Sequence, residues 1–135
     1  MTAPRLFSIL RQGPYLIASV HTALDDSQLV RFQRDLVERI GADRARGVVI
    51  DVAALDVLDS FGSRTLRDIA EMARLRGAVT VIVGIQPDVA FAMVSLGMST
   101  GTLVTALDLE EGLEYLDTTI PRRGGTAPDR RLSAR

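Results

Sequence analysis

The sequence predicts an α/β fold with a mainly parallel sheet, an N-terminal hairpin and about four helices. Two short runs of β-branched and aliphatic residues, 47–52 and 78–83, read as buried strands. Each is followed by a segment with helical spacing of apolar residues. Two further β-like runs, separated by Gly13-Pro14, precede this region. Strands that alternate with helices are typical of right-handed β-α-β units in a parallel sheet.

The N-terminal third predicts a hairpin and one helix. Residues 6–12 and 15–20 are the two strands of the hairpin. The segment 25–27, Asp-Asp-Ser, offers capping side chains for a helix, and Gly41 fits its end. The apolar face of this helix is formed by Leu29, Phe32, Leu36 and Ile40.

The central strand 47–52 leads into a helix that starts at Ser60 and is closed by Gly77. Its apolar positions, Gly62, Leu66, Ile69, Ala70 and Ala73, recur at helical spacing, with charged residues on the opposite face. After the strand 78–83, Pro87 suits the first turn of a short helix that Gly97 stops.

The remaining elements complete one domain, which we predict to span residues 1–120. Residues 102–106 are a last strand, and Leu109, Leu113 and Leu116 define a terminal helix. Residues 121–135 have five arginines, one aspartate and almost no apolar residues, so we predict a disordered Arg-rich tail. This tail carries a net charge of +4, which leaves about −5 for the rest of a chain whose total is −1. Such a body is a poor match for nucleic acid.

Composition excludes several kinds of chemistry. The 135 residues include no cysteine, so a disulfide, a thiolate metal site and a cysteine nucleophile are impossible. All 16 basic residues are arginine, which excludes a lysine Schiff base and a P-loop lysine. His21 is the single histidine. We therefore expect no catalytic residues, no metal and no cofactor. The absence of a long apolar run or signal peptide leads us to expect a cytoplasmic protein.

Ser60 is the residue on which a function can be argued. It lies at or next to a predicted helix N-cap, where its oxygen could accept a hydrogen bond from the amide of residue 62 or 63. In that structural role, Ser60→Ala would lower stability by about 1 kcal/mol. The alternative is a phosphorylation site, because a phosphate there would meet free amides and the positive end of the helix dipole. The residues alone leave both roles open.

Several short motifs carry a resemblance to a known family. They are Leu24-Asp25-Asp26, Gly47 to Asp51, Asp59-Ser60-Phe61, Gly84-Ile85-Gln86-Pro87, Leu96-Gly97 and Thr105 to Glu110. With the order of elements, they resemble the STAS family of anti-sigma factor antagonists, whose fold is that of SpoIIAA. Within that family the sequence is most similar to the RsbS-like scaffold subunits of the stressosome, over about residues 5–117.

The resemblance implies a function that rests on partners. It implies a non-catalytic stressosome scaffold that sequesters an RsbT-type serine kinase, together with RsbR-type STAS paralogues, in a homo- or hetero-oligomer. Phosphorylation of Ser60 would release the kinase into a stress-response or sigma-factor pathway, and an RsbX-type phosphatase would reset the system. Asp59, Phe61, Gly62 and Ser63 are the expected kinase-binding residues. The second phosphorylation position of RsbR-type proteins falls near Ala92 or Met93, which cannot be phosphorylated.

Two other functions remain open from the sequence. A SpoIIAA-like antagonist would bind an anti-sigma kinase directly and would be a monomer at micromolar concentration. A small-ligand or nucleotide module, or a hydrolase with Ser60 as nucleophile, belongs to another class. The hydrolase is disfavoured because His21 lies in a different element and no G-x-S-x-G motif is present.

Overall fold

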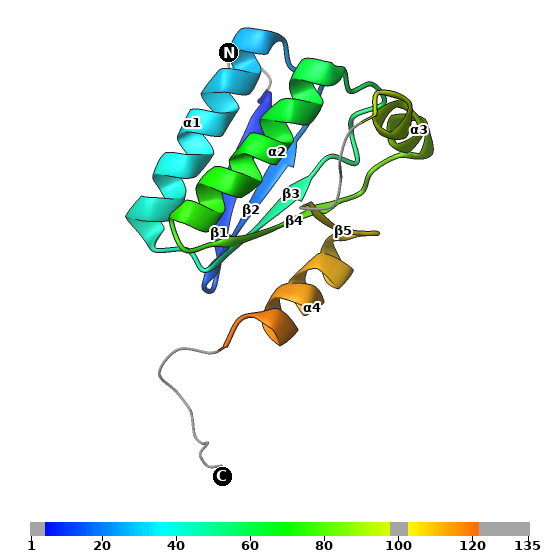
Figure 1. The fold of residues 1–135 in the computed structure, drawn as a ribbon. Coiled ribbons are helices and arrows are strands. Elements are labelled where there is room, and N and C mark those ends of the chain that lie inside the picture. The colour runs from blue at the N-terminus through cyan, green and yellow to red at the C-terminus, as the bar shows by residue number, and fades with distance from the viewer. Residues whose placement is uncertain (1–4, 98–102, 122–135) are drawn as a thin grey trace.

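The computed structural model describes residues 5–97 and 103–121, and it confirms the predicted α/β fold and order of elements. A hairpin comes first and helices then alternate with strands (Figure 1). The elements are β1 (Phe7–Gln12), β2 (Tyr15–Val20), α1 (Asp26–Asp43), β3 (Gly47–Asp51), α2 (Ser60–Leu75), β4 (Val79–Val83), α3 (Pro87–Ser95), β5 (Val104–Ala106) and α4 (Leu109–Thr119).

The sheet has the strand order β1-β2-β3-β4-β5. The pair β1 and β2 is antiparallel, whereas β2 to β5 run parallel. Ile17, Val49 and Val81 occupy the same register position on neighbouring strands. The carboxyl ends of β3 and β4 therefore lie next to each other, and the loops that leave them start side by side.

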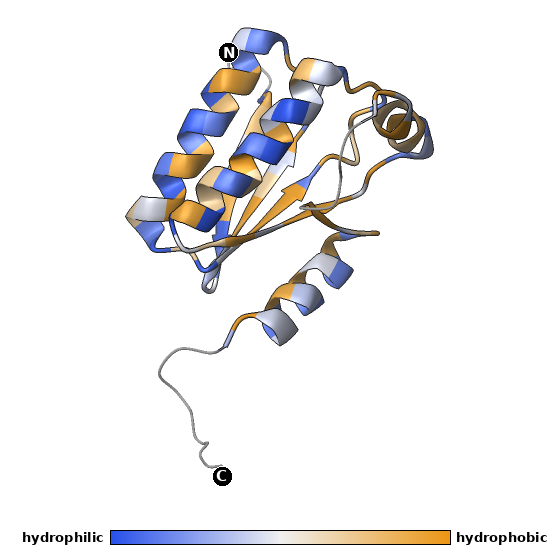
Figure 2. Cartoon of the chain, in the orientation of Figure 1, coloured by the Kyte–Doolittle hydropathy of each residue, from blue (hydrophilic) through white to orange (hydrophobic). Residues whose placement is uncertain are grey.

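Helices cover the two faces of the sheet unequally. Helices α1 and α2 lie together over one face, and α4 lies on the other (Figure 1). The strands are predominantly apolar, while α1 and α2 show hydrophilic residues on the side turned away from the sheet (Figure 2). The larger core joins α1, α2 and α3 to the sheet and has Phe32, Ile50 and Ile69 at its centre. The smaller core packs Leu116 of α4 against Val49 and Val81.

The end of α1 differs from the prediction. Gly41 lies within the helix, which continues to Asp43, and Arg44 forms the C-cap with a left-handed φ of 51°. The place that a side chain at position 41 would occupy is taken by the guanidinium of Arg76. Gly41 therefore serves close packing rather than helix termination, and the sequence pattern does not distinguish these uses of glycine.

The remaining boundaries shift by one or two residues. The strands predicted at 6–12, 47–52 and 78–83 are one residue shorter. The last strand, predicted at 102–106, spans Val104–Ala106, with Leu103 before it and Thr102 outside the described residues. Gly77 and Gly97 follow the ends of α2 and α3 with positive φ values of 88° and 68°, as a stop signal predicts. Apart from Pro121, the predicted Arg-rich tail also lies outside the described residues.

Candidate functional site: the start of helix α2

Two loops at the carboxyl ends of β3 and β4 are fastened to each other. The amide of Val52 donates a hydrogen bond of 3.0 Å to the carbonyl of Val83. The side-chain amide of Gln86 donates one of 2.7 Å to the carbonyl of Ala53. Gly84, with a φ of 80°, lies so close that a Cβ there would approach the backbone of Ala53 to 3.1 Å. Glycine is needed both for this conformation and for this approach.

Asp59, rather than Ser60, caps α2. Asp59 is extended, and its carboxylate oxygen accepts a hydrogen bond of 2.8 Å from the amide of Gly62. Its carbonyl accepts the bond from the amide of Ser63 at 2.9 Å. Ser60 is the first residue of the helix, so the predicted hydrogen bond from the amide of residue 62 or 63 to the Ser60 oxygen is wrong. Aspartate and serine are about equally good N-cap residues, so the residue types alone do not decide which of the two caps the helix.

The Ser60 side chain therefore does not cap the helix. It is exposed, and its hydroxyl has no hydrogen-bond partner among the described residues. The amides of Ser60 and Phe61 likewise meet no acceptor within that part of the chain, as expected for the first turn of a helix. Arg64, one turn further on, lies on the same helical face, is exposed and forms no ion pair there.

The expected kinase-binding residues differ in how far they are exposed at the surface. Asp59 is exposed and Phe61 is half-buried. Gly62 and Ser63 are buried, and Ser63 is 0% exposed, so in this conformation neither offers a side chain to a partner. The hydroxyl of Ser63 has no hydrogen-bond partner in the described structure. Ser63 therefore does not present its hydroxyl at the surface, because position 63 lies on the core side of α2.

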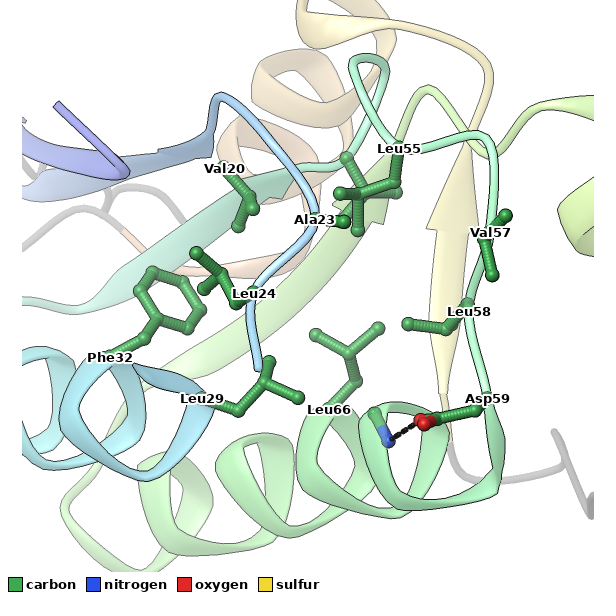
Figure 3. Close-up of a pocket in the computed structure, with 12 residues that line it drawn as sticks. Val20, Ala23, Leu24, Leu29, Phe32, Leu55, Val57, Leu58, Asp59 and Leu66 are labelled. Atoms are coloured by element: carbon green, nitrogen blue, oxygen red, sulfur yellow. Dashed lines mark hydrogen bonds between the residues drawn. The ribbon is translucent and has the colours of Figure 1, made fainter. Parts of the chain in front are cut away.

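An apolar pocket of about 90 Å³ lies beside the start of α2 (Figure 3). It is formed by the loop before α1, by α1 itself, and by the loop that carries Asp59. Figure 3 shows Leu24, Leu58 and Leu66 directed into it, with Asp59 at its edge. Val57, at its rim, is 66% exposed. Sequence inspection missed this pocket; the only signal was a segment, residues 52–58, that is apolar except for Asp56 and is not a strand.

The histidine at position 21 is not placed beside Ser60. His21 interacts with Ser8 across the hairpin, with 3.1 Å between Nε2 and Oγ, and so is engaged on β1 rather than with Ser60. Within residues 5–97 and 103–121, no three histidine or acidic side chains are placed to hold a metal ion. No helix in the same ranges combines the length and apolar character needed to cross a bilayer. Ser60 thus offers an accessible hydroxyl that forms no hydrogen bond with a histidine or any other described residue.

Comparison with known proteins identifies the family to which this fold belongs. Residues 8–112 match the STAS domain family. This match covers well over half of the chain, and the protein therefore belongs to the STAS family. The structure agrees, since SpoIIAA in its unphosphorylated form superposes with a TM-score of 0.68 at 13% identity, which supports the fold alone.

More specific similarity is to stressosome proteins. A serine-to-glutamate variant of Moorella thermoacetica RsbS is 33% identical, with a TM-score of 0.74, over 83% of this chain and 95% of that one. A chain in a solved structure described as the molecular architecture of the stressosome, a signal integration and transduction hub, is 31% identical to this chain. It superposes with a TM-score of 0.68 over 82% of this chain and 96% of that one. The RsbT co-antagonist protein RsbRA of Bacillus subtilis is 26% identical over 91 residues. That match spans 67% of this chain but only 33% of RsbRA.

The capping geometry predicts effects of different size at two neighbouring residues. Asp59→Ala should lower the free energy of unfolding by about 1 kcal/mol, because the amide of Gly62 loses its acceptor. Ser60→Ala should change it by less than about 0.5 kcal/mol, since an exposed side chain without a partner is removed. Urea denaturation of both variants measures the difference. Asp59→Asn, which retains a capping oxygen, is the control and should lose only a few tenths of that amount; equal losses in the two alanine variants would contradict the assignment of the cap.

Proposed function

We propose that this protein is a non-catalytic scaffold of a stressosome-like complex that sequesters an RsbT-type serine kinase and releases it when Ser60 is phosphorylated. The observation that carries the proposal is an exposed, unpartnered serine at the first position of α2 in a STAS domain. Similarity to RsbS and to a stressosome chain above 30% identity supports the choice of complex. RsbR-type paralogues and an RsbX-type phosphatase are the further partners, and a stress-response or sigma-factor pathway is the output.

The first turn of α2 is suited to carry a phosphate. A phosphate on Ser60 can accept hydrogen bonds from the free amides of Ser60 and Phe61, and it lies at the positive end of the helix dipole. Arg64 stands four residues on, within reach of an i to i+4 pair. Because Asp59 and not Ser60 holds the cap, modification of Ser60 leaves the hydrogen bond to Gly62 in place. The fold therefore tolerates the modified state.

The surface around Ser60 is suited to bind a protein in the unmodified state. The apolar pocket and the exposed Val57 offer an anchor for an aliphatic side chain, and interface cores are typically built in this way. Asp56 and Asp59 lie next to this anchor and are exposed. Phosphorylation adds nearly two negative charges to a surface that is already acidic. A kinase face that accepts the neutral hydroxyl would then meet uncompensated charge and dissociate.

Phosphate mapping tests the site. With an RsbT-type kinase and Mg-ATP, the protein should gain one phosphate, located on Ser60 by peptide mapping, and Ser60→Ala should gain none. Ser63→Ala serves as the matched control and should still be phosphorylated, because Ser63 is fully buried. An active kinase that leaves Ser60 unmodified, or that places the phosphate elsewhere, would refute the proposed switch.

Kinase capture tests the electrostatic step. Ser60→Asp should weaken binding of the kinase by at least tenfold in a calorimetric titration, because a fixed negative charge enters the contact surface. Gln12→Glu adds a charge at an exposed position on β1, away from α2, and should bind like the unmodified protein. Equal affinity of the Ser60→Asp variant and the unmodified protein would show that the kinase does not sense charge at this position.

Titration of the phosphoserine tests the role of Arg64. An arginine beside the phosphate favours the dianion and so lowers its second pKa from the ordinary value of about 6. In Arg64→Gln this pKa should rise by about 0.3 unit, as measured by phosphorus NMR on the Ser60-phosphorylated protein, which corresponds to one helical ion pair. Arg34→Gln on α1 is the control, and its phosphoserine should titrate as in the unsubstituted protein. An unchanged pKa in Arg64→Gln would mean that the two groups do not interact.

A further inference from the structure

The end of α2 remote from Ser60 borders a cavity that is separate from the apolar pocket beside Ser60. It is an open cleft of about 520 Å³ at the C-terminal ends of α1 and α2. Figure 1 shows these two helix ends side by side at one end of the sheet. Three of the lining residues are arginines, Arg44, Arg46 and Arg76, and none is acidic. This concentration of positive charge stands out in a body whose net charge is negative.

The three guanidinium groups are not neutralised by the described part of the chain. Other arginines do have partners there, since Arg39 pairs with Asp43 at 2.9 Å and Arg74 with Glu71 at 2.8 Å. Side-chain hydrogen bonds or ion pairs are absent at Arg44, Arg46 and Arg76 across the same ranges. Each guanidinium presents five N–H donors in a planar fork that matches a phosphate or carboxylate. The cleft therefore contains three guanidinium groups and no acidic side chain that could accept their hydrogen bonds.

Two unfavourable backbone features are concentrated in the same cleft. Gly41 lies within α1, where glycine is less favourable than alanine, and its missing side chain makes room for the guanidinium of Arg76. Arg44 has a left-handed φ of 51°, which is unfavourable for a residue with a side chain. Both features position arginines. Unfavourable backbone conformations cluster at ligand-binding and active sites.

Helix capping explains only part of this arrangement. Arg44 and Arg76 directly follow α1 and α2, where a positive charge interacts favourably with the helix dipole. Arg46, however, precedes β3 and is held by its backbone, which donates to Pro14 and accepts from Val79. It adds a third like charge to the cleft. Three like charges that line one cleft favour the binding of an anion there.

We propose that this cleft binds a small molecule that carries two or more adjacent phosphate groups. Its volume lies in the range of small-ligand sites, and clustered arginines recognise phosphate oxygens in pairs. Leu75 is the only large exposed apolar residue of the lining, so the cleft lacks the apolar centre of a protein interface. No aromatic residue lines it for stacking on a base, and recognition is directed to the phosphates. The site is independent of Ser60 and of its kinase.

Calorimetric titration of the whole chain with pyrophosphate, at low ionic strength, tests the proposal. Saturable binding of one pyrophosphate per chain is expected, with at least tenfold weaker binding in Arg76→Gln and in Arg46→Gln, since each removes one charged donor group. Arg34→Gln removes an exposed arginine from α1 outside the cleft and should bind like the unsubstituted protein. Far-ultraviolet circular dichroism of each variant establishes that the fold is retained.

The outcomes separate this site from its alternatives. No saturable binding at millimolar pyrophosphate overturns the proposal, as does an equal loss of affinity in Arg34→Gln, which would indicate general charge attraction. A synthetic peptide with the acidic sequence of residues 107–119, titrated in parallel, tests for a protein partner. Binding of this peptide, lost in Arg76→Gln, without binding of pyrophosphate would replace the small ligand with an acidic protein segment. None of these outcomes decides whether Ser60 is phosphorylated, so the two proposals are tested separately.

Discussion

The hydrogen-bonded junction between the loops after β3 and β4 is the constraint on which the candidate site depends. Parallel pairing brings the two strand ends together, and the bonds from Val52 to Val83 and from Gln86 to Ala53 fasten the chains that leave them. Gly84 permits the contact by having no side chain. Because the loop before α2 is fixed at this point, Asp59 reaches the position from which it caps the helix, and Ser60 is left on the surface.

The sequence was sufficient for the fold because its strongest signals are local and periodic. Continuous apolar runs marked β3 and β4, and helical spacing marked α1 and α2, in agreement with the structure. The predictions were wrong at residues whose type can have more than one structural role. Gly41 was expected to end a helix and instead admits Arg76, and Ser63 was expected on the surface but is 0% exposed. Neither outcome can be derived without knowing what packs against the helix.

The candidate site was predictable to the level of one residue and no further. The motif Asp59-Ser60 placed the serine at the start of a helix, and the structure keeps it there. Which of the two side chains caps the helix depends on the backbone angles of Asp59, which are set by the preceding loop. The apolar pocket is assembled from residues as distant in sequence as Val20 and Leu66. The arginine cleft likewise joins the ends of two helices, so both cavities are properties of the tertiary structure.

Helix α2 has 16 residues and is about 24 Å long, with Ser60 at one end and the arginine cleft at the other. Its peptide dipoles attract negative charge at the first end and repel it at the second. An anion at Ser60 would therefore be held partly by the backbone amides, which substitutions other than proline leave in place. An anion in the cleft is opposed by the same backbone and is retained by side chains alone. The two ends consequently differ in how they can diverge among related proteins: a cleft that loses its arginines loses all attraction for anions, whereas the serine end keeps its attraction as long as the helix itself is formed.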